Sequence, residues 1–339
     1  MRRIYAAMVV STSLISLQCI AQNDAVVVTA TRFAERALNV PVGMTIIGAE
    51  KIRGSTARSL PQLLAQEAGI VTRDLTGSPD LQVDLRGFGA GADQNTLVLV
   101  DGQRLNEIEL VTVRWSSIPL DSIERIEILR GSGAVLYGGG ATGGTINIIT
   151  RSTAPQSRSA IIRAGKGSFG KSEQSGEISA ANEHLGVALR FNDQSADNYR
   201  ENNRFKQQNI DGELRLSGGT GHIAFKFGLE NQSLRLPGAR TRDQLTSDPR
   251  GASTPRDFST RDGTRLGVVS TIDLGFAEIS ADAFLRDSVR TSSQIDYFFG
   301  GLFDVYLDTR SKVRSLSPRI RIPFLVPGFR NSFTFGVDA

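Results

Sequence analysis

The feature that most constrains the fold is a period-two alternation of apolar and polar residues, which recurs from Ala160 onward. In HIAFKFGLE (222–230) the large apolar residues take the odd-numbered positions, and Lys226 lies on the opposite face. HLGVALRF (184–191) and LGVVSTIDLGF (266–276) repeat the pattern. Such alternation is typical of strands with one apolar and one polar face. It predicts an antiparallel sheet over this part of the chain.

Residues 1–21, MRRIYAAMVVSTSLISLQCIA, predict export. Arg2 and Arg3 precede an apolar segment, and the small residue Ala21 suits cleavage of a signal peptide. The one cysteine of the chain, Cys19, would leave with the signal, so the mature protein has no disulfide and no cysteine metal ligand. Loss of the two arginines lowers the formal charge from +4 to +2 (4 minus 2), which does not favour nucleic-acid binding.

The predicted export signal helps to decide whether the strands form a soluble or a membrane-embedded sheet. A soluble sandwich would show the same alternation, but the signal and the charged, glycine-bearing polar faces favour a transmembrane barrel with lipid outside and a polar lumen. Residues 155–339 have room for about eight to ten strands of about ten residues. The polar segments 192–203 and 236–264 are predicted as extracellular loops, and 217–221 as a short periplasmic turn.

The preceding region, residues 32–151, mixes helix and strand signals and predicts an α+β domain. In SLPQLLAQEAGI (59–70) Ser59 can cap a helix, Pro61 suits its first turn and Gly69 can end it. Strand signals follow, with glycine-rich connections between them, at 81–87, 96–102, 125–129 and 145–150.

Six motifs of this region carry a resemblance. In chain order they are VVVTATR (26–32), LRGFG (85–89), VLVDGQRLN (98–106), IPLDSIERIEILRG (118–131), VLYG (135–138) and ATGGTINIITR (141–151). Their order and spacing resemble the plug domain of TonB-dependent outer-membrane receptors. The resemblance implies a plug domain (32–151) followed by the strands of a transmembrane barrel (155–339), of which full-length members have about 22. Because fewer strands fit here, we expect the N-terminal half of a receptor, from a truncated gene or a partial record.

The resemblance also explains the β-prone run near the start of the mature chain. Residues 22–31 would include the TonB box, which the periplasmic protein TonB grips as an added β-strand. An exposed run of this kind otherwise invites aggregation. The alternative is that the run is only the first strand of the plug. The residues matched to the TonB box are Asp24, Ala25, Val26, Val27, Val28, Thr29 and Ala30.

In this family, ligand contacts come from apical plug loops and outer barrel loops, which match 75–80 and 106–115 here. Trp115 is predicted to be an exposed indole that serves as a binding platform. Arg86 and Arg130, both in RG dipeptides, are predicted to form ion pairs with the barrel wall. The residues predicted to contact the ligand are Ser78, Asp80, Asn106, Glu109, Arg114 and Trp115.

The implied function is active uptake across the outer membrane, driven through TonB and the ExbB/ExbD complex, without covalent chemistry or a covalently bound cofactor. A ferric siderophore is the first choice of ligand, and cobalamin or haem the alternative. Two other classes of protein share some of these features. A passive adhesin would not need the plug motifs, and GKGSFGKS (165–172) fits the P-loop pattern of a nucleotide-binding enzyme but precedes no apolar helix. A hairpin turn explains its glycines better, and His184 and His222 suggest no metal site.

Overall fold

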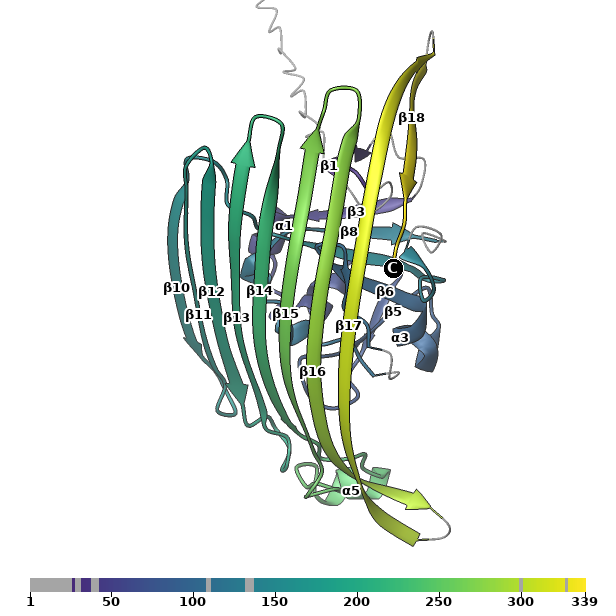
Figure 1. Ribbon diagram of the computed structural model, residues 1–339. Coiled ribbons are helices and arrows are strands. Elements are labelled where there is room, and N and C mark those ends of the chain that lie inside the picture. Colours follow the sequence, from purple (N-terminus) through teal and green to yellow (C-terminus); the bar gives the residue numbers. More distant parts are fainter. Residues whose placement is uncertain are drawn as a thin grey trace, which may run out of the picture.

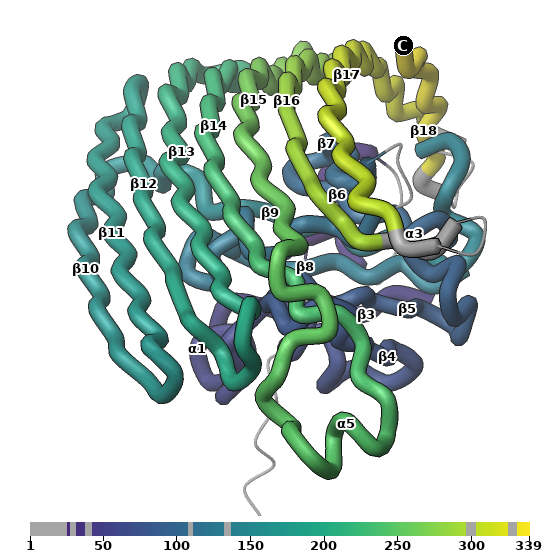
Figure 2. The backbone as a smooth tube through the Cα atoms, turned by 90° about the horizontal axis from the view of Figure 1, so that it is seen from below, coloured from purple at the N-terminus to yellow at the C-terminus, as the bar shows by residue number. Residues whose placement is uncertain are grey.

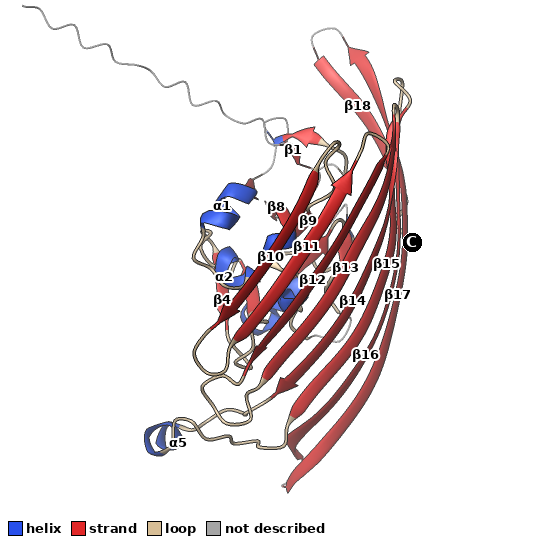
Figure 3. Cartoon of the chain, turned by 90° about the vertical axis from the view of Figure 1, so that its left-hand side faces the viewer, coloured by secondary structure: helices blue, strands red, loops and turns tan. Residues whose placement is uncertain are grey.

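The computed structural model describes residues 26–27, 32–37, 43–107, 111–131, 137–298, 301–326 and 329–339. It has two parts. A curved sheet of nine strands forms a wall, and a smaller α+β unit lies against the concave face of that wall (Figures 1, 2 and 3). We call these parts the wall sheet and, for residues 43–151, the plug unit. Among the described residues, no helix is long and apolar enough to cross a membrane.

In the wall sheet each strand pairs antiparallel with the next one in the sequence, as the alternation predicts. Short turns join the strands at one end, and longer loops that include α5 (Arg242–Ser247) lie at the other (Figure 1). The strands are β10 (Arg158–Lys166), β11 (Ser172–Ala181), β12 (Leu185–Ala196), β13 (Phe205–Gly218), β14 (Gly221–Arg235), β15 (Phe258–Asp273), β16 (Glu278–Phe298), β17 (Gly301–Val326) and β18 (Phe329–Gly336).

The two faces of the wall sheet differ in polarity. On β14, Phe225 and Phe227 point away from the plug unit and are 43% and 42% exposed. Glu230 on the same strand points toward the plug unit and is 5% exposed. The period-two pattern therefore places charged side chains between the two parts of the molecule, where each one needs a partner.

The plug unit is built on a five-stranded sheet in the order β3-β8-β9-β6-β7, in which only β6 and β9 run parallel. Its core contains Ile126, Ile128, Ile146 and Ile148, all fully buried. The strands and helices of this unit are β3 (Met44–Gly48), α1 (Ala49–Gly54), α2 (Leu60–Leu64), β4 (Ile70–Arg73), β5 (Gln82–Leu85), α3 (Ala92–Asn95), β6 (Thr96–Val100), β7 (Gln103–Arg104), β8 (Ile123–Arg130) and β9 (Gly144–Thr150).

Two local predictions need correction. The helix expected between a cap at Ser59 and an end at Gly69 stops at Leu64, and Ser59 makes no capping hydrogen bond. After Leu64 the chain tightens, because the amide of Glu67 donates to the Leu64 carbonyl three residues back. The polar segments expected as loops are shorter, since β12 extends to Ala196 and β15 begins at Phe258. Polar strand tips can continue the hydrogen-bonded ladder beyond the apolar band.

The segment GKGSFGKS forms a hairpin turn. It joins β10 to β11, whose ladder runs from Arg158 opposite Ala180 to Lys166 opposite Ser172. The amide of Gly167 donates to the Lys171 carbonyl at 2.9 Å, and the Lys171 ammonium pairs with Glu173 at 2.6 Å. A strand, not a helix, follows the turn, so no helix N-terminus is available to bind phosphate.

This geometry gives a first expected result. Lys171→Ala should leave the stability of the fold nearly unchanged, because a partly exposed surface ion pair contributes about 0–1 kcal/mol. Urea-induced unfolding of the purified protein and a titration with ATP check it. Micromolar ATP binding that the substitution abolishes would contradict the hairpin interpretation.

Candidate functional site

A cavity of about 330 Å³ lies at the long-loop end, between the plug unit and the inner face of the wall sheet. Two plug loops contribute to it, one around Thr76 to Asp80 and one around Val111 to Arg114. Strands β14, β15 and β16 close the other side. We call it the apical cavity. Its polar and charged lining includes Ser78, Asp80, Asp93, Arg114, Gln232, Arg261 and Arg290.

The first plug loop is held against the wall by the chain beyond β12. Gly77 adopts φ +74, and a Cβ added there would lie 2.5 Å from the side-chain nitrogen of Asn203. The side chain of Asn198 donates to the Gly77 carbonyl at 3.2 Å. Ser78, 7% exposed, accepts a hydrogen bond from the amide of Asp80 at 3.2 Å. The loop is therefore fixed at the entrance of the apical cavity.

Asp80 joins both plug loops to the wall. Its carboxylate accepts hydrogen bonds from the amide of Ser116 at 2.7 Å and from the side-chain amide of Gln232 at 2.6 Å. Burial raises the pKa of Asp80 above its ordinary value, and burial likewise raises the pKa of Asp93. Both carboxyl groups therefore take up a proton more readily than they would in water.

Arg114 lies at the base of the apical cavity with its side chain 5% exposed. Its guanidinium pairs with Glu230 of β14 at 2.5 Å and with Glu107 of the plug unit at 3.2 Å. Glu107 also pairs with Arg261 of β15 at 3.3 Å and with Arg286 of β16 at 3.2 Å. Burial would lower the pKa of Arg114, but the two glutamates outweigh it and raise the pKa. The cluster is thus a charged junction between the plug unit and three wall strands.

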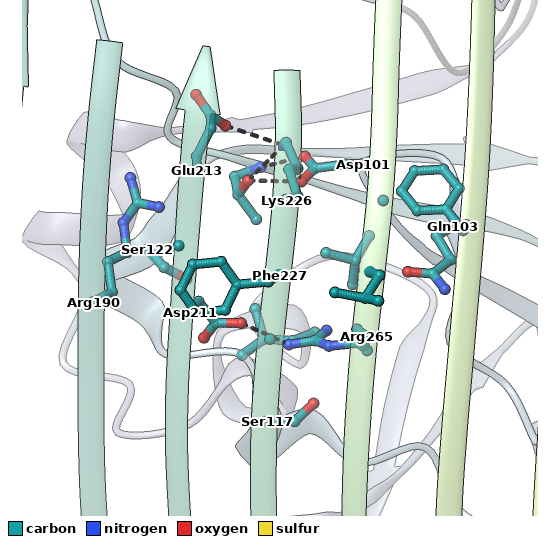
Figure 4. Close-up of a pocket in the computed structure, with 18 of the residues that line it drawn as sticks. Asp101, Gln103, Ser117, Ser122, Arg190, Asp211, Glu213, Lys226, Phe227 and Arg265 are labelled. Carbon is teal, nitrogen blue, oxygen red and sulfur yellow. Dashed lines mark hydrogen bonds and ion pairs between the residues drawn. The ribbon is translucent and has the colours of Figure 1, made fainter. Parts of the chain in front are cut away.

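A second contact lies deeper, around a cavity of about 80 Å³ shown in Figure 4. The Lys226 ammonium of β14 pairs with Asp101 at 2.7 Å and with Glu213 of β13 at 3.4 Å. Asp101 also accepts hydrogen bonds from the amide and hydroxyl of Thr150, at 2.8 and 2.7 Å. Burial would raise the pKa of Asp101, but Lys226 and these bonds lower it. The residue is therefore held as an anion against the wall.

Removing this lysine should loosen the plug unit. Lys226→Met leaves the carboxylates of Asp101 and Glu213 without their cation, and because Lys226 is partly exposed the expected loss of plug stability is about 1–3 kcal/mol. Urea-induced protease cleavage of the plug unit in the whole protein measures it, with Lys171→Ala as the control that removes a partly exposed ammonium. An unchanged urea midpoint would show that the ion pair does not hold the plug unit in place.

The structure places the predicted ligand residues in different surroundings. Ser78, Asp80 and Arg114 meet at the apical cavity. Asn106 is 6% exposed and bonds to plug backbone, accepting from the Val98 amide and donating to the carbonyls of Asp93 and Thr96. Glu109 lies outside the described residues.

Trp115 corrects one expectation. Its indole is 2% exposed and belongs to the hydrophobic core, so the prediction of an exposed binding platform is wrong. The residue begins a short 3₁₀ helix, Trp115–Ser117, whose backbone turns the side chain inward. A loop sequence without periodicity gave no signal of this burial.

Arg130 has hydrogen-bond partners within the plug unit, and Arg86 lies in the same unit. Arg130 donates to the Ala68 carbonyl at 2.5 Å and to the Thr45 hydroxyl at 3.3 Å. The Arg86 guanidinium lies beside Gly131. Within the described ranges, neither arginine has an ion pair with the wall sheet, so their role at the plug–barrel boundary stays a prediction. Arg114, predicted as a ligand residue, does pair with Glu230 of the wall sheet, whereas sequence reasoning did not single out other residues that make such contacts, among them Glu107, Lys226, Arg261 and Arg286. The sequence feature that could have identified these four residues is a charged side chain on the polar face of a strand or at a turn.

Of the segment matched to the TonB box, the described residues form β1 (Val26–Val27), which pairs antiparallel with β2 (Glu35–Arg36). Val27 is fully buried and Val26 is 45% exposed. Nearby, Arg32 makes a two-bond contact with Asp338, at 3.0 and 2.7 Å. Asp24, Ala25, Val28, Thr29 and Ala30 lie outside the described residues.

A plug unit seated against a curved meander of strands is the arrangement of a plugged barrel. Residues 36–145 match the family described as TonB-dependent Receptor Plug Domain. The unliganded ferric citrate transporter FecA shares the fold with a TM-score of 0.73 at 16% identity, over 84% of this chain and 45% of that chain. The chain therefore carries the plug domain of the TonB-dependent receptors, followed by antiparallel strands with the fold of part of their barrel.

Two curated relatives extend the comparison. Vitamin B12 transporter BtuB of Photobacterium profundum is 35% identical over 156 residues, which cover 46% of this chain and 25% of that protein. The ferrienterobactin receptor of Escherichia coli (strain K12) is 36% identical over 150 residues, which cover 39% of this chain and 19% of that protein. These matches thus cover about a quarter or less of the length of the two relatives.

Proposed function

We propose that the protein is an outer-membrane receptor for energised uptake of an anionic metal chelate, most specifically a ferric siderophore. The observation that carries this proposal is the lining of the apical cavity, where Arg114, Arg261 and Arg290 converge from the plug unit and two wall strands. Guanidinium groups bind carboxylate and other oxyanions through paired, charge-assisted hydrogen bonds. A chelate whose iron is held by anionic oxygens presents the complementary charge.

The proposal also assigns a role to each segment of the chain. Residues 1–21 direct export, 22–31 include the TonB box, 32–151 form the plug and 155–339 contribute barrel strands whose outer apolar side chains face lipid. TonB, energised by ExbB/ExbD, would bind the N-terminal segment and move the plug, with no reaction on the ligand itself. Cobalamin uptake is the second candidate, supported by the identity to a vitamin B12 transporter.

Growth tests separate the two ligands. A strain that lacks the receptor is complemented with the full-length gene and supplied with single iron chelates, haem or cobalamin under limitation. Growth on an anionic iron chelate that depends on both the gene and TonB is the expected result. Growth restored by cobalamin alone would replace the ligand assignment.

The raised pKa values of Asp80 and Asp93 predict a pH dependence. As the pH falls toward these raised values, the two carboxyl groups take up protons and the negative charge at the apical cavity decreases, so anion binding should strengthen. The expected trend is tighter sulfate binding by the purified receptor at pH 5 than at pH 7.5, since sulfate keeps its charge over this range. Asp80→Asn with Asp93→Asn should flatten the curve; an equal slope in both proteins would contradict the assignment.

A further inference from the structure

Strands β15 and β16 place arginines directly opposite each other. In their register Arg261 faces Arg290, and four residues along the strands Arg265 faces Arg286. Like charges in directly opposed positions of a sheet are destabilising. We call these four side chains the arginine quartet. Two such pairs side by side on the face toward the plug unit require negative charge from elsewhere.

The plug unit supplies that charge. Glu107, with its side chain 2% exposed, pairs with Arg261 through one carboxylate oxygen and with Arg286 through the other. Arg286 also donates to the carbonyls of Arg104 and Leu105, at 3.3 and 3.1 Å. On the wall side, Arg265 pairs with Asp211 at 2.9 Å. One carboxylate of the plug unit therefore lies between two guanidinium groups of the wall sheet.

The arginine quartet also joins the two cavities. Arg261 and Arg290 line the apical cavity, and Arg265 lines the deeper one, where Figure 4 shows it pointing toward Asp211. Four residues of a strand span about 13 Å at about 3.3 Å per residue. Glu107 lies between the two levels, and its neighbours in the sequence, Val111 to Arg114, line the apical cavity. A ligand bound in the apical cavity thus contacts Arg114, which itself pairs with the blocking carboxylate of Glu107 at 3.2 Å.

We propose that the arginine quartet is a second anion site in the lumen wall, which Glu107 occupies while the plug unit is seated. Withdrawal of the Glu107 carboxylate opens the site, and the anionic chelate moves from the apical cavity onto it. The proposal rests on the proposed uptake function for the identity of the anion. The site itself is defined by the cross-strand arginine pairs and by the position of Glu107 between them.

A gain of binding tests the site. The full-length receptor is purified in detergent, and inorganic pyrophosphate serves as the multivalent anion in titration calorimetry. Glu107→Ala should bind pyrophosphate at least about tenfold more tightly than the unchanged receptor, with an affinity that falls as salt rises. The matched control is Glu213→Ala, which removes a buried carboxylate that pairs with Lys226 instead. Equal affinity in Glu107→Ala and the unchanged receptor would overturn the proposal.

A further variant tests where the additional pyrophosphate binds. It removes the two arginines of the quartet that do not line the apical cavity. Adding Arg265→Gln and Arg286→Gln to Glu107→Ala should abolish the gain, because neither residue lines the apical cavity. A gain that persists in this variant would assign the anion to the apical cavity and overturn the second site. Glu213→Ala shows whether the loss of a buried carboxylate is by itself enough to raise pyrophosphate affinity, so it separates the site from a general loosening of the plug unit.

The rate of uptake is the second measurement that tests the proposed anion site. Arg265→Gln alone should lower the maximal uptake rate of the growth-supporting chelate about tenfold and leave its binding affinity at the cell surface unchanged; reduced affinity at an unchanged rate would overturn the proposal. Arg256→Gln, in an exposed loop, is the control. The pyrophosphate titration needs neither TonB nor uptake. Its failure therefore removes the second site alone, whereas absence of any growth-supporting chelate removes the uptake function alone.

Discussion

Replacing Arg114 by methionine is expected to lower the affinity of the receptor for its anionic ligand by about 10- to 100-fold, because hydrogen bonds to a charged group contribute about 1.5–3 kcal/mol. The same change leaves Glu230 and Glu107 buried beside a missing cation, at 2.5 and 3.2 Å from its former position. Breaking a buried pair in this way costs about 3–5 kcal/mol. Binding of the growth-supporting chelate to intact cells measures the affinity.

The loss of affinity must be separated from the loss of stability. Adding Glu230→Gln to Arg114→Met removes the unpaired charge, so this double variant should recover stability in urea but not affinity. Arg204→Gln is the matched control, since this arginine is 73% exposed in its side chain and pairs with Asp197 in an outer loop. Native affinity in Arg114→Met would show that the apical cavity does not bind the ligand through Arg114.

The sequence predicted the elements of this fold because their burial is periodic. A strand with one buried face must alternate, so the wall strands could be located from residues such as Phe225 and Phe227, and the apolar run TLVLV predicted β6. The strand ends could not be placed equally well. Beyond the apolar band both faces are polar, so the extension of β12 to Ala196 has no signature in composition.

The site was only partly predictable because its contacts are non-local. Glu107 and Arg261 are 154 positions apart (261 minus 107), and nothing near either residue announces their 3.3 Å ion pair. Asn106 looked like an exposed polar loop residue, yet its side chain bonds to plug backbone. A polar residue in a loop can serve a ligand or the backbone, and tertiary structure decides between them. The charge on the inner strand faces, by contrast, was visible as a pattern.

The second large effect is expected at the N-terminal segment, where Val27→Pro should abolish uptake and preserve ligand binding. Proline removes a backbone N–H and fixes φ, and both changes oppose strand pairing. In the structure Val27 lies opposite Glu35 in the short ladder of β1 and β2, so the segment already adopts the extended form that strand addition requires. The ladder belongs to neither the plug sheet nor the wall sheet, so the apical cavity should remain intact.

Val26→Thr is the matched control, because it changes a side chain that is 45% exposed and keeps the backbone donor. It should transport at the native rate. Uptake of the labelled chelate and its binding to energy-depleted cells are measured in parallel for both variants. If the segment were only the first strand of the plug, Val27→Pro would weaken binding and uptake together, since the damage would be to the fold. Loss of uptake with native binding places the defect instead at the step where TonB adds a strand to the receptor.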